Sequence, residues 1–127
     1  MTHEQIIDYC LQKKGAFADF PFDSFFPVIK VKAPLQEKGR IFAQVFYLRG
    51  EPMVTLNCTP QTAEYYRNKY PHSVTRGYHC PPVQQPHFNT ISLDGSVSDD
   101  EILKMIDYSY ETVVAKFPKY VQKRFDK

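Results

Sequence analysis

The sequence of 127 residues has no tryptophan, only five glycines and no long run of apolar residues. No stretch approaches the roughly 18 consecutive apolar residues that a membrane-spanning helix requires, so we expect no membrane partner. The first residues include Glu4 and Asp8 and form no apolar segment, so we also expect no secretory signal peptide.

Cysteine is scarce as well. Cys10, Cys58 and Cys80 are odd in number and far apart in the sequence. Such spacing does not form a disulfide framework. We therefore predict three free thiols and a protein of the reducing cytoplasm.

A strong excess of charge of one sign is also absent, because 16 lysines and arginines stand against 14 aspartates and glutamates. Dedicated nucleic-acid-binding proteins usually show a larger imbalance or a clustered basic face. The chain does have ample material for a core, with 43% hydrophobic and 15% aromatic residues. Its length suits one domain, which we predict over residues 1–127.

Three segments carry helix signals, at about residues 2–15, 59–70 and 98–116. The first and third begin with a hydroxyl residue followed three positions later by Gln or Glu, which is the spacing of a capping box. The second begins with Thr59 and Pro60, a capping hydroxyl and a proline in the first turn. The third segment repeats apolar residues at helical spacing, which predicts a face buried against a sheet. A short basic helix is expected at the C-terminus.

Four segments read as strands because they alternate in polarity or are rich in β-branched and aromatic residues. They are VIKVKA (28–33), IFAQVFYL (41–48), PMVTLNC (52–58) and FNTISLDG (88–95). The short Arg49-Gly50-Glu51 connection makes the second and third a hairpin. The order of elements predicts an α+β fold, an antiparallel sheet with helices packed on one face.

The stretch RGYHCPPVQQPHFNTISL (76–93) holds two histidines and a cysteine, which raises the question of a zinc site or a thiol nucleophile. Structural zinc sites usually show paired ligands at short spacing, and adjacent His79 and Cys80 would point in opposite directions in an extended segment. A thiol nucleophile needs a base and an oxyanion site, and no local motif supplies them. We expect no metal, no cofactor and no enzymatic activity, with both chemistries kept open as alternatives.

Basic residues form separate groups along the chain. One group lies on and around the first long loop and the hairpin turn, and comprises Lys30, Lys32, Lys38, Arg40 and Arg49. A second flanks the end of the second helix and a third crowds the C-terminus. If the sheet loops point the same way, the first group would contact phosphates, whereas the alternative is an ordinary solvated surface.

Several motifs occur in the order found in a known family. They are FPFD…VIKVKA, GRIFA, P-VTLNCTP, GYH, HFNTISLDG and LKMIDYSYETVV. The most specific are Gly77-Tyr78-His79, His87-Phe88-Asn89-Thr90 and Ser109-Tyr110. Over roughly residues 3–124 the chain resembles the MmcQ/YjbR family of small bacterial proteins.

The resemblance implies a CyaY-like fold, a twisted antiparallel sheet that carries helices. It also implies binding of double-stranded DNA through a "double wing" of sheet loops and strands, for which the candidates are the five basic residues of the first group. The alternative is an interaction or small-ligand module built on the aromatic segment 17–26 and the loop 78–88. Its candidate residues are Tyr78, His79, His87, Phe88 and Asn89.

The sequence departs from the family pattern where the family carries lysines. Asn57 stands in place of a lysine, and CPPVQQP replaces a lysine-containing stretch after Gly-Tyr-His. Phe88 stands where tryptophan is usual. We therefore expect DNA binding to be weak and largely independent of base sequence.

Overall fold

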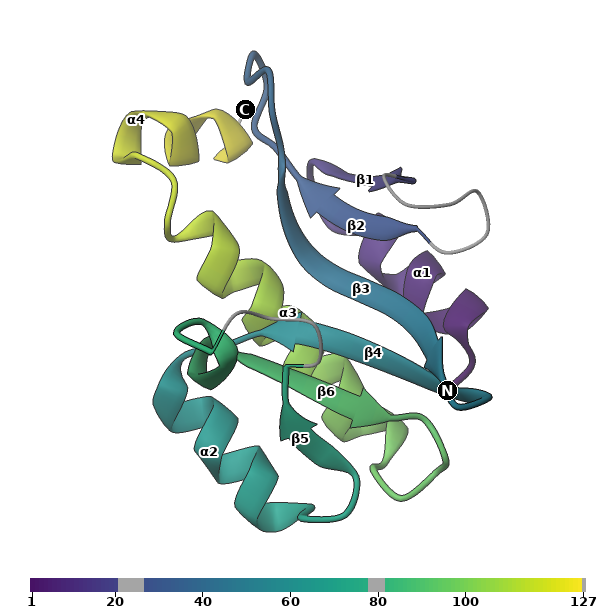
Figure 1. The fold of residues 1–127 in the computed structure, drawn as a ribbon. Coiled ribbons are helices and arrows are strands. Elements are labelled where there is room, and N and C mark those ends of the chain that lie inside the picture. The colour runs from purple at the N-terminus through teal and green to yellow at the C-terminus, as the bar shows by residue number, and fades with distance from the viewer. Residues whose placement is uncertain (21–26, 78–81, 127) are drawn as a thin grey trace.

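A twisted antiparallel sheet of six strands, in the order β1-β2-β3-β4-β6-β5, forms one layer of the computed structural model (Figure 1). The structure describes residues 1–20, 27–77 and 82–126. The strands are β1 (Ala16–Asp19), β2 (Val28–Val31), β3 (Arg40–Leu48), β4 (Glu51–Asn57), β5 (Val74–Arg76) and β6 (Phe88–Ser92).

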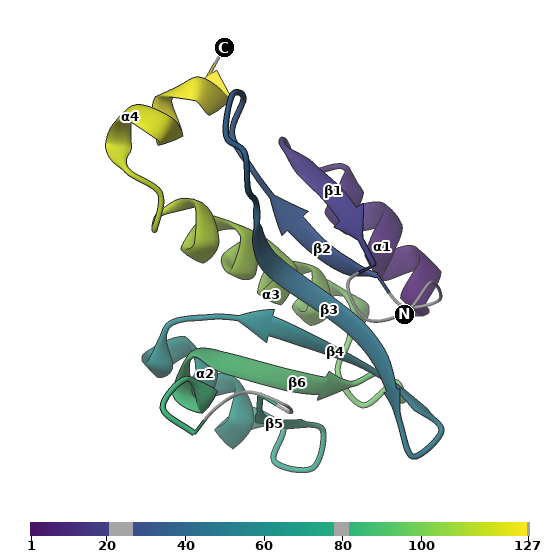
Figure 2. The ribbon, with the colours of Figure 1, turned by 45° about the horizontal axis from the view of Figure 1, so that its top comes forward.

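Helices α1 (His3–Leu11), α2 (Pro60–Lys69) and α3 (Asp99–Val114) form the second layer, and α4 (Lys119–Gln122) lies beyond it, near the loop between β2 and β3. The 3-10 turns are η1 (Gln85–His87) and η2 (Lys123–Asp126). Helices α1 and α3 both contact β2, β3 and β4, whereas α2 contacts β5 and β6 (Figure 2). This arrangement confirms the predicted α+β class. None of the helices in the described part of the chain combines the length and hydropathy that crossing a bilayer would need.

The predicted caps are present at all three long helices. The Thr2 hydroxyl accepts a hydrogen bond from the Gln5 amide, and the Gln5 side chain accepts one from the Thr2 amide, which completes a capping box. The hydroxyls of Thr59 and Ser98 accept from the amides at the third helical position of α2 and α3. These local contacts fix where the helices begin.

The predicted hairpin is also confirmed. Leu48 pairs with Glu51, so the loop between β3 and β4 has two residues. Arg49 and Gly50 both have positive φ, at 52° and 82°. Two positive φ angles define the type I′ turn, whose twist matches that of the flanking strands.

Two strands and one helix end differ from the sequence-based expectation. The short strands β1 and β5 were not predicted, because their residues become strands only by pairing with β2 and β6. Helix α1 ends at Leu11, earlier than the predicted end near Gly15. Gly15 does have a positive φ of 79°, and a Cβ there would lie 2.3 Å from the Lys32 carbonyl oxygen.

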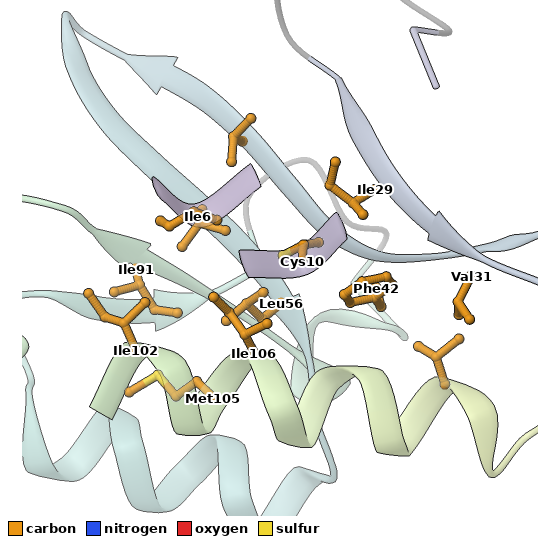
Figure 3. Packing of buried hydrophobic residues seen from close by; sticks show 14 of the residues in the cluster. Ile6, Cys10, Ile29, Val31, Phe42, Leu56, Ile91, Ile102, Met105 and Ile106 are labelled. Carbon is orange, nitrogen blue, oxygen red and sulfur yellow. The ribbon is translucent and has the colours of Figure 1, made fainter. Parts of the chain in front are cut away.

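The core lies between the sheet and α1 and α3 (Figure 3). Ile102 and Ile106 of the predicted α3 stripe are 1% and 0% exposed, and they pack in one cluster with Leu56 and Ile91 of the sheet. The stripe also includes Met105, whereas the expected member Leu103 is only half-buried. The core therefore confirms the predicted placement of α3.

Candidate functional site

Asn89, which we predicted as part of a ligand or surface site, is used inside the fold. Its side chain is 3% exposed, accepts a hydrogen bond from Arg67 at 2.9 Å and donates one to the Ala63 carbonyl at 3.1 Å. Arg67 and Ala63 belong to α2, so Asn89 fastens α2 to β6. Asn89 therefore has a structural role, and its assignment to a ligand or surface site stays a prediction.

The other polar residues of the recognised motifs have similar structural roles. The hydroxyls of Thr90 and Thr55 are 2.7 Å apart and link β6 to β4 on the sheet face opposite Asn89. Ser109 is fully buried in α3, where its hydroxyl accepts from the Asn57 amide at 2.8 Å and donates to the Phe42 carbonyl. Ser109 thus joins α3 to the backbones of β3 and β4.

We predict that Ser109→Ala lowers the free energy of unfolding by about 1–3 kcal/mol, because it leaves the buried Asn57 amide without a partner. Urea unfolding followed by circular dichroism measures this change. Glu111→Ala, at an exposed position of the same helix, is the matched control and should change stability little. Equal stability of the two variants would contradict the role assigned to Ser109.

The five basic residues that the sequence singled out do not form one surface. Lys30 is engaged with Asp19, with Nζ 2.6 Å from the carboxylate, and this hydrogen bond lowers the Asp19 pKa. Arg40 and Arg49 occupy opposite ends of β3, a strand of nine residues. At about 3.4 Å per residue, the nine positions between them correspond to roughly 30 Å. Arg40 and Arg49 are therefore too far apart to contact neighbouring phosphates, and DNA contact by the individual residues stays a prediction.

A different basic surface is assembled by the tertiary structure. The C-terminal segment packs beside the loop between β2 and β3, where the Arg124 guanidinium donates to the Pro34 carbonyl at 3.2 Å (Figure 1). The Arg40 guanidinium lies 5.9 Å from the centre of the Phe117 ring. We call this surface the basic end, and its members are Lys32, Lys38, Arg40, Lys116, Lys119, Lys123 and Arg124.

Charges at the basic end are largely unpaired. Within the described part of the chain, none of its seven cations takes part in an ion pair, whereas Lys13, Lys30, Lys69 and Lys104 do. Acidic residues gather instead at the start of α3, at Asp99, Asp100 and Glu101. The sequence named the C-terminal cations but gave no signal that they adjoin the first loop.

A cleft opens beside the basic end, where β3 and β4 diverge. The two strands pair from Ala43 and Leu56 to the hairpin turn, whereas Arg40 and Ile41 have a pairing partner on the β2 side only (Figure 1). The cleft has a volume of about 440 Å³. It is lined by Arg40, Ile41, Asn57, Gln84, His87, Phe88, Val113 and Lys116. The structure thus brings the predicted residues His87 and Phe88 together with Arg40.

The rim at η1 is fixed by main-chain hydrogen bonds. The His87 amide donates to the Gln84 carbonyl at 2.9 Å, and the His87 carbonyl accepts from the Cys58 amide at 2.8 Å. At the base of the cleft, Asn57 is 5% exposed, and its Oδ1 makes no hydrogen bond. The cleft therefore combines two cations, two aromatic side chains and two amides.

Several predicted residues lie outside the described part of the chain. These are Tyr78, His79 and Cys80, together with most of the aromatic segment, residues 21–26. Among the described residues, no three His, Cys, Asp or Glu side chains come together as a set of metal ligands. The expectations about His79 and Cys80 therefore stay predictions.

Cys10 and Cys58 are buried free thiols. Burial raises the pKa of Cys10 to about 12 and that of Cys58 to about 11, because the apolar surroundings disfavour the thiolate. Neither thiol is therefore ionised near neutral pH.

We predict that both thiols resist iodoacetamide at pH 8 in the folded protein and react fully in denaturant. Mass spectrometry of a Cys80→Ser variant, which keeps only these two cysteines, measures the modification. Alkylation of the folded variant at the rate of free cysteine would show that the two sites are more open than the structure indicates.

Comparisons with known proteins agree on one family. A family model described as YjbR matches residues 11–112. The protein called "Uncharacterized protein YjbR" of Escherichia coli (strain K12) is 32% identical over 123 residues, which cover 97% of this chain and 96% of that protein.

Two solved structures share the fold. The crystal structure of Deinococcus radiodurans protein DR2400 is 27% identical, with a TM-score of 0.86 over 98% of this chain and 88% of that chain. A crystal structure of a protein from Pseudomonas syringae is 21% identical, with a TM-score of 0.70 over 89% of this chain and 99% of that chain.

Proposed function

The chain belongs to the YjbR family, and from this premise we propose that it binds double-stranded DNA weakly, through the basic end, with little preference for sequence. The observation that carries the proposal is the gathering of seven unpaired cations on the surface where the C-terminal segment meets the loop between β2 and β3. Clustered cations of this kind neutralise phosphates and release counterions.

The distribution of charge supports this surface over the rest of the molecule. The formal net charge of the chain is only +2, so attraction to DNA depends on where the charges lie. The acidic start of α3 lies at the other end of a helix of 16 residues, about 24 Å away at 1.5 Å per residue. A DNA duplex approaching the basic end is therefore separated from the three carboxylates at the start of α3.

The make-up of the basic end accounts for the expected lack of sequence preference. Its cations come from a loop, one strand end and short C-terminal helices, and Lys and Arg on such elements contact phosphates without reading base edges. We also propose that the protein binds DNA without catalysing a reaction and that it acts in the cytoplasm, in keeping with its three scattered cysteines.

A titration of random duplex DNA at several salt concentrations tests the proposal. For three or four phosphate contacts, affinity should fall roughly 40-fold to 150-fold between about 50 and 200 mM salt. Absence of binding at the lowest salt concentration would show that the proposed function is wrong.

A further inference from the structure

We propose that the cleft between β3 and β4 binds a nucleotide, with its phosphate on Arg40 and Lys116 and its base against Phe88 and His87. The volume of about 440 Å³ falls within the range of about 300–1,000 Å³ that small-molecule sites occupy. The inference deepens the proposed DNA binding and shares Arg40 and Lys116 with it, but the cleft needs an unpaired nucleotide, whereas the basic end would bind a duplex.

The charge of the cleft favours a phosphate. Arg40 and Lys116 line it from β3 and from the turn that follows α3, and no carboxylate is among its described lining residues. The Phe117 ring, 5.9 Å from the Arg40 guanidinium, restrains that side chain. A restrained guanidinium loses less freedom when it binds a phosphate oxygen pair.

The rings in the cleft favour a heterocyclic base. Phe88 is half-buried at the start of β6, and His87 is exposed on η1, where its backbone is held by hydrogen bonds to Gln84 and Cys58. Ile41, 40% exposed, adds an apolar surface from β3. Unpaired bases stack on phenylalanine and histidine rings in this way, whereas bases inside a duplex are already stacked.

The amides of the cleft match the hydrogen-bonding edge of a base. Asn57 lines the cleft and keeps a buried Oδ1 without a hydrogen bond, which is unfavourable in the free protein. Rotation of this side chain toward the cleft would let Oδ1 accept from a base N–H group. Gln84, exposed on the opposite rim, supplies a second amide.

The same chemistry has two sources, a free nucleotide or an unpaired nucleotide within a DNA strand. Titrations with dAMP and with single-stranded oligo(dA), followed by amide NMR shifts, separate them. An oligonucleotide affinity about tenfold or more above that of dAMP assigns the site to a strand, because further phosphates then reach the basic end. Equal affinities assign it to the free nucleotide.

The decisive variant is Arg40→Gln with Lys116→Gln, and the matched control is Arg49→Gln with Lys104→Gln, two exposed cations outside the cleft and the basic end. The double cleft variant should bind dAMP at least about tenfold more weakly, since it loses both charge-assisted contacts to the phosphate. The control should bind dAMP as wild type does. The amide spectra of all variants also report whether each is folded.

A second variant, Phe88→Leu, keeps an apolar side chain in β6. It should weaken the binding of dAMP without weakening the binding of inorganic phosphate. Inorganic phosphate that binds as tightly as dAMP, or dAMP binding unchanged in the double cleft variant, would overturn the nucleotide assignment. If duplex DNA binds and dAMP does not, this inference alone fails. If dAMP binds and duplex DNA does not, the proposed function alone fails.

Discussion

Ile106→Asp should remove most of the stability of the fold. Ile106 is 0% exposed in the middle of α3 and belongs to the same cluster as Leu56, Phe42 and Ile6, so α3, α1 and the sheet all meet around it (Figure 3). Every residue that the structure describes in this cluster is hydrophobic, so none of them could pair with a carboxylate. The free energy of unfolding should fall by about 4 kcal/mol or more, out of the roughly 5–15 kcal/mol typical of a small domain.

Urea unfolding followed by circular dichroism measures the loss. Lys104→Asp, two positions earlier in α3, introduces the same side chain at a site that is 65% exposed. That control should lower the free energy of unfolding by less than about 1 kcal/mol, because its carboxylate stays in water. An unchanged midpoint for Ile106→Asp would mean that α3 does not pack on the sheet as the structure describes.

Neutralising Lys38, Lys119 and Lys123 to Gln should reduce affinity for duplex DNA by about a hundredfold or more at 0.1 M salt. The three side chains are exposed and belong to the basic end but not to the cleft, so folding and the cleft should be unaffected. The slope of log K against log salt should flatten by about three units if each contacts a phosphate.

The matched control neutralises three exposed cations away from the basic end, Arg49, Arg76 and Lys104. It removes the same net charge, so it separates a local contact from a general change in charge. The control should keep the wild-type slope. A control that weakens binding as much as the test variant would show that the basic end is an ordinary solvated surface.

The recognised motifs illustrate what a pattern of residues can and cannot reveal about a site. The sequence marked Asn89, Thr90 and Ser109 as characteristic of the family, and their positions in a strand and a helix were correctly predicted. Their structural roles were not predicted, because a buried polar side chain and a ligand-binding one have the same chemistry. Only the hydrogen-bond partners show that Asn89 and Ser109 fasten α2 and α3 to the sheet and that Thr90 links β6 to β4.

In the cleft, the structure added residues that no sequence motif had marked as part of a site. His87 and Phe88 were candidates from the sequence, whereas only the structure places Lys116 and Gln84 beside them. Divergence of β3 from β4 creates the space between them: Ala43 and Gln44 pair with both β2 and β4, whereas Arg40 and Ile41 pair with β2 alone. No local signal in β3 predicts where its pairing with β4 stops, because that depends on where the distant partner strand ends.

By itself the sequence determined the α+β class, the starts of the helices, the two-residue hairpin and the family, because caps, turns and periodicity depend on residues only a few positions apart. The tertiary structure alone decided where β1 and β5 pair and which cations share a surface. Arg124 reaches the Pro34 carbonyl across 90 positions of sequence, while Arg40 and Arg49, nine positions apart, lie at opposite ends of β3. Electrostatic contact depends on distance in space, and strand pairing between distant segments sets that distance.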